Sequence, residues 1–312
     1  MSTARSVPVT RDEDLEGDEA LETLRGTPRR QLARDAAVRF RAADGFSHSR
    51  ALGFQITLTL LPALIAVIGL AEALEQDTAR RVVQETINAL APGAAGDLLT
   101  DALRQGTSTA RQESGEAALT GGLLAALVSG TTAMAQIERG ANRIYGTERD
   151  RPSLRKYGNA LLLAVTAGLL AMLAVVVLVG GQAIREAVGP SGELDLALKI
   201  ARWPVGLALV VVSVALLFAY APRRRQPEPS WLAFGAVLSA LLWVVFMGLL
   251  KLYIDVTDAF GATYGPLAGT IGVLLWSFLV SVGLFAGLAF AAQLEAIRAG
   301  VPDPRLSREH NE

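Results

Sequence analysis

The sequence contains no cysteine and only two histidines, His48 and His310. The absence of cysteine excludes disulfide bonds, thiolate catalysis and cysteine-ligated metal sites. Both histidines lie in or next to the terminal regions, and neither belongs to a histidine–carboxylate cluster at metal-ligand spacing. The sequence also lacks an HExxH pair, a Gly-x-Ser-x-Gly elbow and a Walker A loop. We therefore predict no catalytic residue, no metal site and no cofactor, and we do not expect an enzyme.

Apolar residues, by contrast, are in excess, at 51% of the 312-residue chain before its 30 glycines are counted. They are concentrated in long blocks, and a helix needs about 20 apolar residues to span the roughly 30 Å of hydrocarbon in a bilayer. We therefore predict an all-α fold, a polytopic membrane helical bundle with six transmembrane helices. The expected spans are about 51–71, 117–137, 157–182, 203–221, 231–254 and 265–292.

Polar segments flank this bundle at both ends of the chain. Residues 1–27 mix acids, arginines, serine and glycine without apolar periodicity, a composition that is typical of a disordered tail. Residues 28–296 then form the predicted six-helix transmembrane domain, and residues 297–312 form a C-terminal tail.

Two regions outside the spans have the periodicity of amphipathic helices. In the N-terminal leader, Leu32, Ala36 and Phe40 repeat at helical spacing among arginines. This helix either lies at the membrane surface or leads, solvated, into the first span. In the first loop, between the first two spans, apolar residues predict two short helices that are broken at Pro92 and Gly93 and cap the bundle on one side.

Basic residues are distributed unequally between the loops and predict the orientation of the chain. The leader, the loop after the second span, the loop after the fourth span and the C-terminal tail are rich in arginine, whereas acids dominate the long first loop. Cytoplasmic loops are enriched in lysine and arginine. We therefore predict that the N- and C-termini both lie in the cytoplasm.

Polar residues inside the predicted spans are candidates for a substrate site, because a polar group in hydrocarbon is costly. The first span holds Gln55, Thr59 and Pro62. The proline removes a backbone donor and leaves carbonyl groups that a ligand or a neighbouring helix can use. The polar side chains either bind a ligand or bond their own helix and an adjacent one.

The last span carries a second set of candidates. Trp276 falls well inside the span, and Gly265 begins a run of small residues at three- and four-residue spacing. Such a run favours close helix packing, and the alternative is a hinge beside a cavity. Gln293 and Glu295 fall where the helix leaves the membrane, and we expect them at a solvated helix end.

The stretch MAQIERGANRIYGTERDRP, residues 134–152, is dense in charge and lies between the second and third spans. Glu138 and Asn142 are four residues apart on a helix, as are Arg139 and Arg143, so each pair shares a face. This face either contacts lipid headgroups at the cytoplasmic boundary or locks and anchors the helices there. Aromatic residues are few among the basic ones, so we do not expect a nucleic-acid patch.

Three segments together resemble one family of membrane proteins: ALGFQITLTLLP, SGTTAMAQIERGANRIYG and YGPLAGTIGVLLWSFLVSVGLFAGLAFAAQLEA. Their order and spacing are similar to the signature regions of the YihY/BrkB family of bacterial inner-membrane proteins, once labelled ribonuclease BN. The resemblance covers about residues 28–300 and implies six spans with both ends in the cytoplasm. It places recurrent family positions at Pro62, Arg139, Asn142, Tyr264, Gly265 and Trp276. Ala289 stands where the family commonly has glutamate, a departure that bears on any mechanism needing that carboxylate.

The resemblance also implies a role in the integrity of the cell envelope and in the export of lipid or lipid-linked material. We expect a multi-pass protein of the bacterial plasma (inner) membrane that is a transporter or flippase of such an amphipathic compound. The alternative is a non-transporting scaffold for envelope integrity, and a ribonuclease is not expected. The expected partners are membrane lipids and envelope proteins, without nucleic acid.

Overall fold

The computed structural model describes residues 3–9, 17–73, 101, 115–178, 192–256 and 267–306. Within these ranges the chain is almost entirely helical, which confirms the predicted all-α class. The two amphipathic helices predicted in the first loop lie outside the described residues. The described helices are α1 (Gly17–Gly26), α2 (Arg29–Ala42), α3 (Gly45–Ala73), α6 (Gly115–Ile144), α7 (Ser153–Leu178), α9 (Glu193–Tyr220), α10 (Pro229–Val256) and α12 (Ala268–Arg298).

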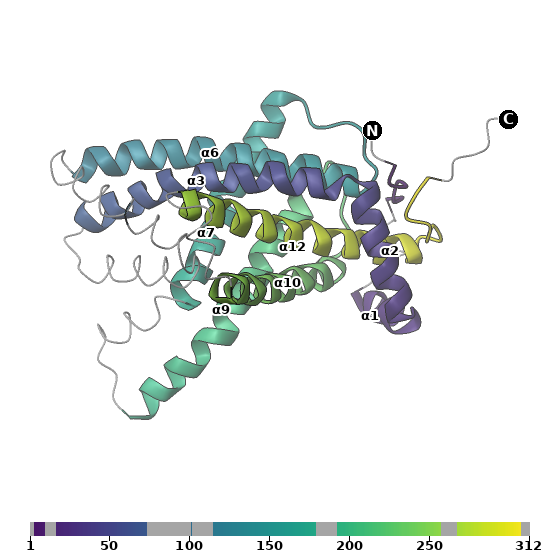
Figure 1. Ribbon diagram of the computed structural model, residues 1–312. Helices are drawn as coiled ribbons and strands as arrows, with labels where there is room; N and C mark the ends of the chain where they lie inside the picture. The colour runs from purple at the N-terminus through teal and green to yellow at the C-terminus, as the bar shows by residue number, and fades with distance from the viewer. Residues whose placement is uncertain are drawn as a thin grey trace.

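Five of the described helices are long and apolar enough to cross a membrane, namely α6, α7, α9, α10 and α12. They correspond to the second to sixth predicted spans and confirm a polytopic bundle. The first predicted span lies within α3, a 29-residue helix that is not one of these five, so the count of six is not confirmed. Helix α3 runs alongside α6 (Figure 1).

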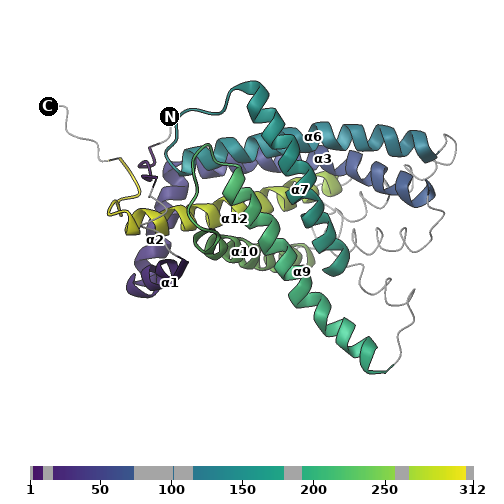
Figure 2. The same cartoon turned by 180° about the vertical axis from the view of Figure 1, so that it is seen from behind.

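Helix α12 lies at the centre of the bundle. It packs against α3 and α6 on one side and against α10 on the other, and α2 crosses its C-terminal end (Figure 1). Helices α7 and α9 form a second pair that runs obliquely to the rest of the bundle (Figure 2). Of the five candidate spans, α12 has the largest buried share, so its side chains reach most of the other helices.

Two glycines bring α10 and α12 into backbone contact. A Cβ atom placed on Gly287 of α12 lies 2.0 Å from Ser239 Oγ and 2.4 Å from the carbonyl oxygen of Gly235, both on α10. A Cβ atom on Gly235 lies 2.5 Å from the carbonyl oxygen of Gly287. Small residues at a helix interface are what allow two backbones to approach this closely. A larger residue at either position therefore requires the two helices to separate.

The N-terminal leader forms helix α2, and its apolar face packs against the bundle. Leu32, Ala36 and Phe40 are buried, which confirms the predicted amphipathic periodicity. Leu32 lies with Trp231 of α10 and Leu294 of α12 in a small core that is separate from the main one. The helix therefore has a third role beside the two left open by the sequence, because its apolar side covers the end of α12.

The prediction of a disordered tail over residues 1–27 is wrong for the parts that the structure describes. Helix α1 forms the last part of this N-terminal region, and Ala20 of this helix is buried. Residues 3–9 are not helical and pair with the C-terminal segment through an isolated β-bridge at Ala4. Ala4 and Val7 are both buried. These buried apolar side chains are too sparse for a periodic pattern, and backbone hydrogen bonds to α2, the end of α6 and the C-terminal segment dock the segment together with them.

Candidate functional site

Glu138 is buried near the end of α6 and forms an ion pair with Arg151 of the α6–α7 loop. Glu138 Oε2 lies 2.9 Å from Arg151 Nη1, and Glu138 Oε1 accepts the backbone N–H of Arg151 at 3.2 Å. The Arg151 guanidinium also donates to three carbonyl oxygens at the end of α9, those of Tyr220, Ala221 and Pro222. The last carbonyls of a helix have no partner within the helix. Arg151 therefore satisfies the end of α9 and ties it to α6.

Asn142, one turn further along α6, joins the same two loops. Its Nδ2 donates to Asp150 Oδ1 at 3.0 Å, and its Oδ1 accepts the backbone N–H of Arg223 at 2.7 Å. Asp150 in turn pairs with Lys156 Nζ at 2.7 Å. The Asn142 amide is fully buried, and both its nitrogen and its oxygen form hydrogen bonds. It therefore holds the α6–α7 and α9–α10 loops together.

The two predicted arginines of this stretch differ in their surroundings. The side chain of Arg139 is 51% exposed, and its Nε lies 3.9 Å from Asp150 Oδ2. Arg143 donates from Nη1 to the carbonyl oxygen of Glu148 at 3.1 Å. Arg139 thus presents a half-exposed cation at the end of α6, whereas Arg143 turns back onto its own loop.

Asp150 is the titratable centre of this network. Burial raises the pKa of its carboxyl group, but hydrogen bonds from Lys156 and Asn142, with the charges of Lys156 and Arg143, outweigh burial and leave the pKa below its ordinary value. A carboxyl group with a lowered pKa contributes stability above its unfolded pKa of about 3.9. That contribution is lost as the pH falls through the lower, folded pKa.

We expect the Asp150→Asn variant to be less stable than the parent at pH 7 and less sensitive to acid. The carboxylate is what Lys156 and Asn142 bind, so the variant lacks the contribution that the parent loses below about pH 4. The measurement is the unfolding midpoint in detergent as a function of pH. Glu148→Gln, at an exposed position in the same loop, is the control. An acid dependence in Asp150→Asn as steep as in the parent contradicts the prediction.

Gln293 and Glu295 do not lie at a solvated helix end, because both are buried. Arg39 Nε of α2 donates to Gln293 Oε1 at 2.8 Å, and Gln293 Nε2 donates to the carbonyl oxygen of Pro302 at 2.6 Å. Glu295 forms an ion pair with Arg224 of the α9–α10 loop. The predicted exposure of Gln293 and Glu295 to solvent is wrong, because the residues that cover this end of α12 come from distant parts of the sequence.

Three large polar residues at this end of the bundle were not predicted from the sequence: Arg39, Tyr145 and Arg224. The Cζ atom of Arg224 lies 4.4 Å from the centre of the Tyr145 ring, a cation–π contact. Burial lowers the pKa of Arg39 to about 10, and burial likewise raises the pKa of the Tyr145 hydroxyl above its ordinary value.

One signal in the sequence could have identified Arg39. It lies three residues after Ala36 and seven after Leu32, so it falls on the apolar face of the α2 pattern, unlike the exposed Arg41. An arginine on the buried face of an amphipathic helix needs partners from elsewhere in the fold.

The polar residues of the first predicted span bond within and between helices. Thr132 Oγ1 of α6 donates to Gln55 Oε1 at 2.9 Å, and Thr59 Oγ1 donates to the backbone carbonyl of Gln55 at 2.8 Å. Pro62 lies inside α3. This arrangement favours the interpretation in which the polar groups bond their own helix and a neighbour.

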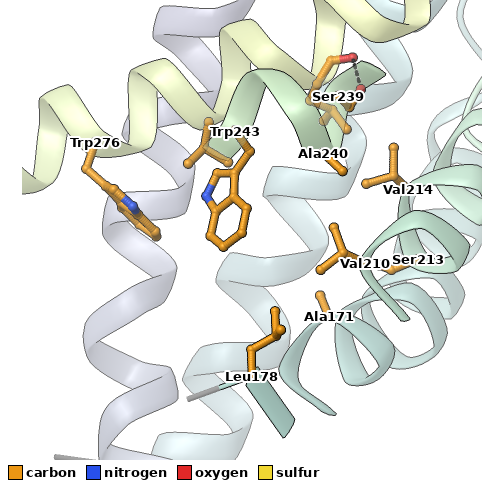
Figure 3. Close-up of a pocket in the computed structure, with 11 residues that line it drawn as sticks. Ala171, Leu178, Val210, Ser213, Val214, Ser239, Ala240, Trp243 and Trp276 are labelled. Carbon is orange, nitrogen blue, oxygen red and sulfur yellow. Dashed lines mark hydrogen bonds between the residues drawn. The ribbon is translucent and has the colours of Figure 1, made fainter. Parts of the chain in front are cut away.

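An apolar cavity of about 270 Å³ lies among α7, α9, α10 and α12. Trp243 and the predicted Trp276 lie on one side of it, and Val210 lies on the facing helix α9 (Figure 3). The lining is apolar apart from the hydroxyl groups of Ser213 and Ser239, which donate to helix carbonyls, and the indole N–H groups of Trp243 and Trp276. The Trp276 N–H is buried and has no partner in the described chain. The cavity is therefore suited to hydrocarbon.

The remaining candidates do not line this cavity or cannot be placed. Gln55, Thr59 and Asn142 are not among its lining residues. Tyr264 and Gly265 lie outside the described residues. Over the described ranges, no group of three or more histidine, aspartate or glutamate side chains is arranged to hold a metal ion.

Comparison with known proteins gives the same family as the sequence motifs. The family model described as "Virulence factor BrkB" matches residues 36–310. The ribonuclease-like protein YfkH of Bacillus subtilis (strain 168) is 27% identical over 269 residues, which cover 85% of this chain and 95% of that protein. A UPF0761 membrane protein of Chromobacterium violaceum is 25% identical over 282 residues, 88% of this chain and 64% of that protein.

A UPF0761 membrane protein of Idiomarina loihiensis is 30% identical over 103 residues, 33% of this chain and 36% of that protein. No solved structure matches the chain. The names of the two UPF0761 relatives describe membrane proteins, and the name of the Bacillus protein describes a likeness to ribonucleases.

Proposed function

Because the chain belongs to the BrkB family of integral membrane proteins, we propose that it is a transporter or flippase of a lipid or lipid-linked compound of the bacterial envelope. The observation that carries this proposal is the apolar cavity among α7, α9, α10 and α12. All four helices are candidate spans by length and composition, which supports a position of the cavity at the depth of the hydrocarbon. Its volume, about 270 Å³, is just below the roughly 300–1,000 Å³ that is typical of ligand pockets. It therefore fits part of a lipid chain.

The basic end of the bundle supports the same proposal. The half-exposed Arg139 is the residue that we assign to headgroup contact, because its cation is available at the end of a candidate span. Glu138 and Asn142 are assigned to helix locking, because both are buried and fully engaged with the loops. The arginine-rich loops lie at this end, as do the described segments nearest the two termini, residues 3–9 and 299–306, which supports a cytoplasmic placement in the bacterial inner membrane.

Filling the cavity is expected to slow transbilayer movement of lipid. In the Val210→Trp variant the indole takes the place of the lipid chain, and a loss of about 55 Å² of apolar contact corresponds to roughly tenfold weaker binding. The measurement is the transbilayer movement of fluorescent lipids in proteoliposomes, with several headgroups. Val212→Trp, on the same helix at an exposed position, is the matched control and is expected to behave like the parent.

The same assay separates transport from the scaffold alternative. Transbilayer movement no faster than in protein-free vesicles, for every headgroup tested, contradicts the proposed transport and favours a non-transporting scaffold. Equal slowing by Val210→Trp and Val212→Trp contradicts the assignment of the cavity. The ribonuclease likeness is part of the Bacillus protein's name, and we propose no nuclease activity for this chain.

A further inference from the structure

A cluster of buried polar residues lies where α2 crosses the end of α12, and it shares no residue with the apolar cavity. We call Arg39, Tyr145, Arg224, Gln293 and Glu295 the arginine cluster. Four of these residues are at most 1% exposed, and the side chain of Arg224 is 5% exposed. They come from α2, the end of α6, the α9–α10 loop and α12.

The arginine cluster holds two guanidinium groups and one carboxylate. Arg224 pairs with Glu295. Every hydrogen bond that Arg39 makes to a described residue goes to a neutral oxygen, that of the Gln293 amide or a backbone carbonyl. The cluster therefore carries one surplus positive charge in a buried place, and a buried ion without a counter-ion is strongly disfavoured.

Three donor atoms of the cluster are buried without a hydrogen-bond partner among the described residues: Arg39 Nη2, Arg224 Nη1 and Tyr145 Oη. They belong to one connected set of contacts. The Arg224 guanidinium lies over the Tyr145 ring at 4.4 Å, and Arg39 Nη1 donates at 3.3 Å to the carbonyl of Ile144, the residue before Tyr145. Each of the three can donate a hydrogen bond, and guanidinium groups match the oxygens of phosphate in geometry and charge.

The N-terminal segment, residues 3–9, covers this cluster. Arg39 Nη1 donates to the carbonyl oxygen of Arg5 at 2.9 Å, and Arg224 Nη2 donates to that of Pro8 at 3.3 Å. The segment contains no acidic residue. It therefore supplies neutral acceptors and leaves the surplus charge in place.

We propose that the arginine cluster binds one phosphate group, carried by a lipid headgroup or by inorganic phosphate. A bound monoanion balances the surplus charge and supplies acceptors for the three unpartnered donors. The cluster lies at the end of the candidate span α6 and in the last two turns of the candidate span α12, at the level where headgroups are expected. Residues 3–9 have to lift for the phosphate to enter. The site does not depend on the proposed transport, because phosphate can bind whether or not lipid crosses the membrane.

The test is the unfolding midpoint of the full chain in detergent, titrated with inorganic phosphate or with short-chain phosphatidic acid at constant ionic strength. We expect the midpoint to rise with both probes, or with phosphatidic acid and not with inorganic phosphate. Tyr145→Phe removes an unpartnered donor and no existing hydrogen bond of the side chain, so it should fold normally and weaken the apparent affinity about tenfold. Arg39→Gln should weaken it at least as much, and Arg41→Gln, exposed on the same helix, should leave it unchanged.

The outcomes identify the ligand or overturn the site. A rise with both probes assigns the phosphate group itself as the ligand, and a rise with phosphatidic acid alone assigns a lipid headgroup. If neither probe raises the midpoint, the proposal is wrong. It is also wrong if the rise is undiminished in Tyr145→Phe. That variant decides the question even if Arg39→Gln fails to fold, because it leaves the hydrogen bonds of both arginines and the ion pair of Arg224 in place.

Discussion

The Arg151→Ala variant is expected to lose about 3–5 kcal/mol of unfolding free energy, because it leaves a buried carboxylate without its cation. The side chain of Glu138 is 2% exposed, and Arg151 is its ion-pair partner. The substitution also removes the donor for the three carbonyl oxygens at the end of α9. Glu138→Ala should cost less, since the remaining arginine side chain is 22% exposed and keeps its carbonyl partners.

The measurement is the unfolding free energy from titration with a denaturing detergent in mixed micelles. Arg149→Ala, at an exposed position in the same loop, is the matched control and is expected to change stability by about 0.5 kcal/mol at most. The double variant Glu138→Ala with Arg151→Ala should cost less than the sum of the single variants, because the two side chains interact directly. Equal losses in Arg151→Ala and Arg149→Ala contradict the assigned role of the ion pair.

The bundle could be predicted because membrane spans are encoded locally. About 20 consecutive apolar residues suffice to identify a span, and the predicted region 231–254 lies inside α10, which covers Pro229–Val256. The polar stretch after the second span was less predictable. Helix α6 continues to Ile144, so Glu138 and Asn142 are helical and share a face as expected. The local sequence did not predict their partners. Glu138 and Asn142 form hydrogen bonds to residues of the loops and not to each other.

The buried polar contacts could not be predicted because their partners are far apart in sequence. Arg39 and Gln293 are separated by 254 positions, and Asn142 and Arg223 by 81. The prediction of disorder for the N-terminal segment was wrong for a related reason. Residues 3–9 have no apolar periodicity, and their order arises from backbone bonds to α2, the end of α6 and the C-terminal segment. Polar composition alone therefore predicted disorder where tertiary contacts supply structure.

Gly287→Ala is expected to destabilise the protein by about 1–3 kcal/mol, although alanine is the better helix former. The added Cβ lies 2.0 Å from Ser239 Oγ and 2.4 Å from the carbonyl oxygen of Gly235. A serine side chain can rotate away, but the carbonyl belongs to the backbone of α10. The two helices must therefore separate at the point where α10 also lines the apolar cavity through Ser239.

Gly283→Ala provides the same chemical change one turn away on α12. Its Cβ lies 3.6 Å from the nearest atoms, an ordinary contact, so the variant should be neutral or more stable by up to about 1 kcal/mol. Combining Gly287→Ala with Ser239→Ala should restore only part of the loss, because the contact with the Gly235 carbonyl persists. Unfolding free energies of the parent and of these three variants in mixed micelles measure this difference. Equal effects at Gly283 and Gly287 mean that the contact between α10 and α12 does not limit stability, and full recovery in the double variant assigns the clash to the serine hydroxyl alone.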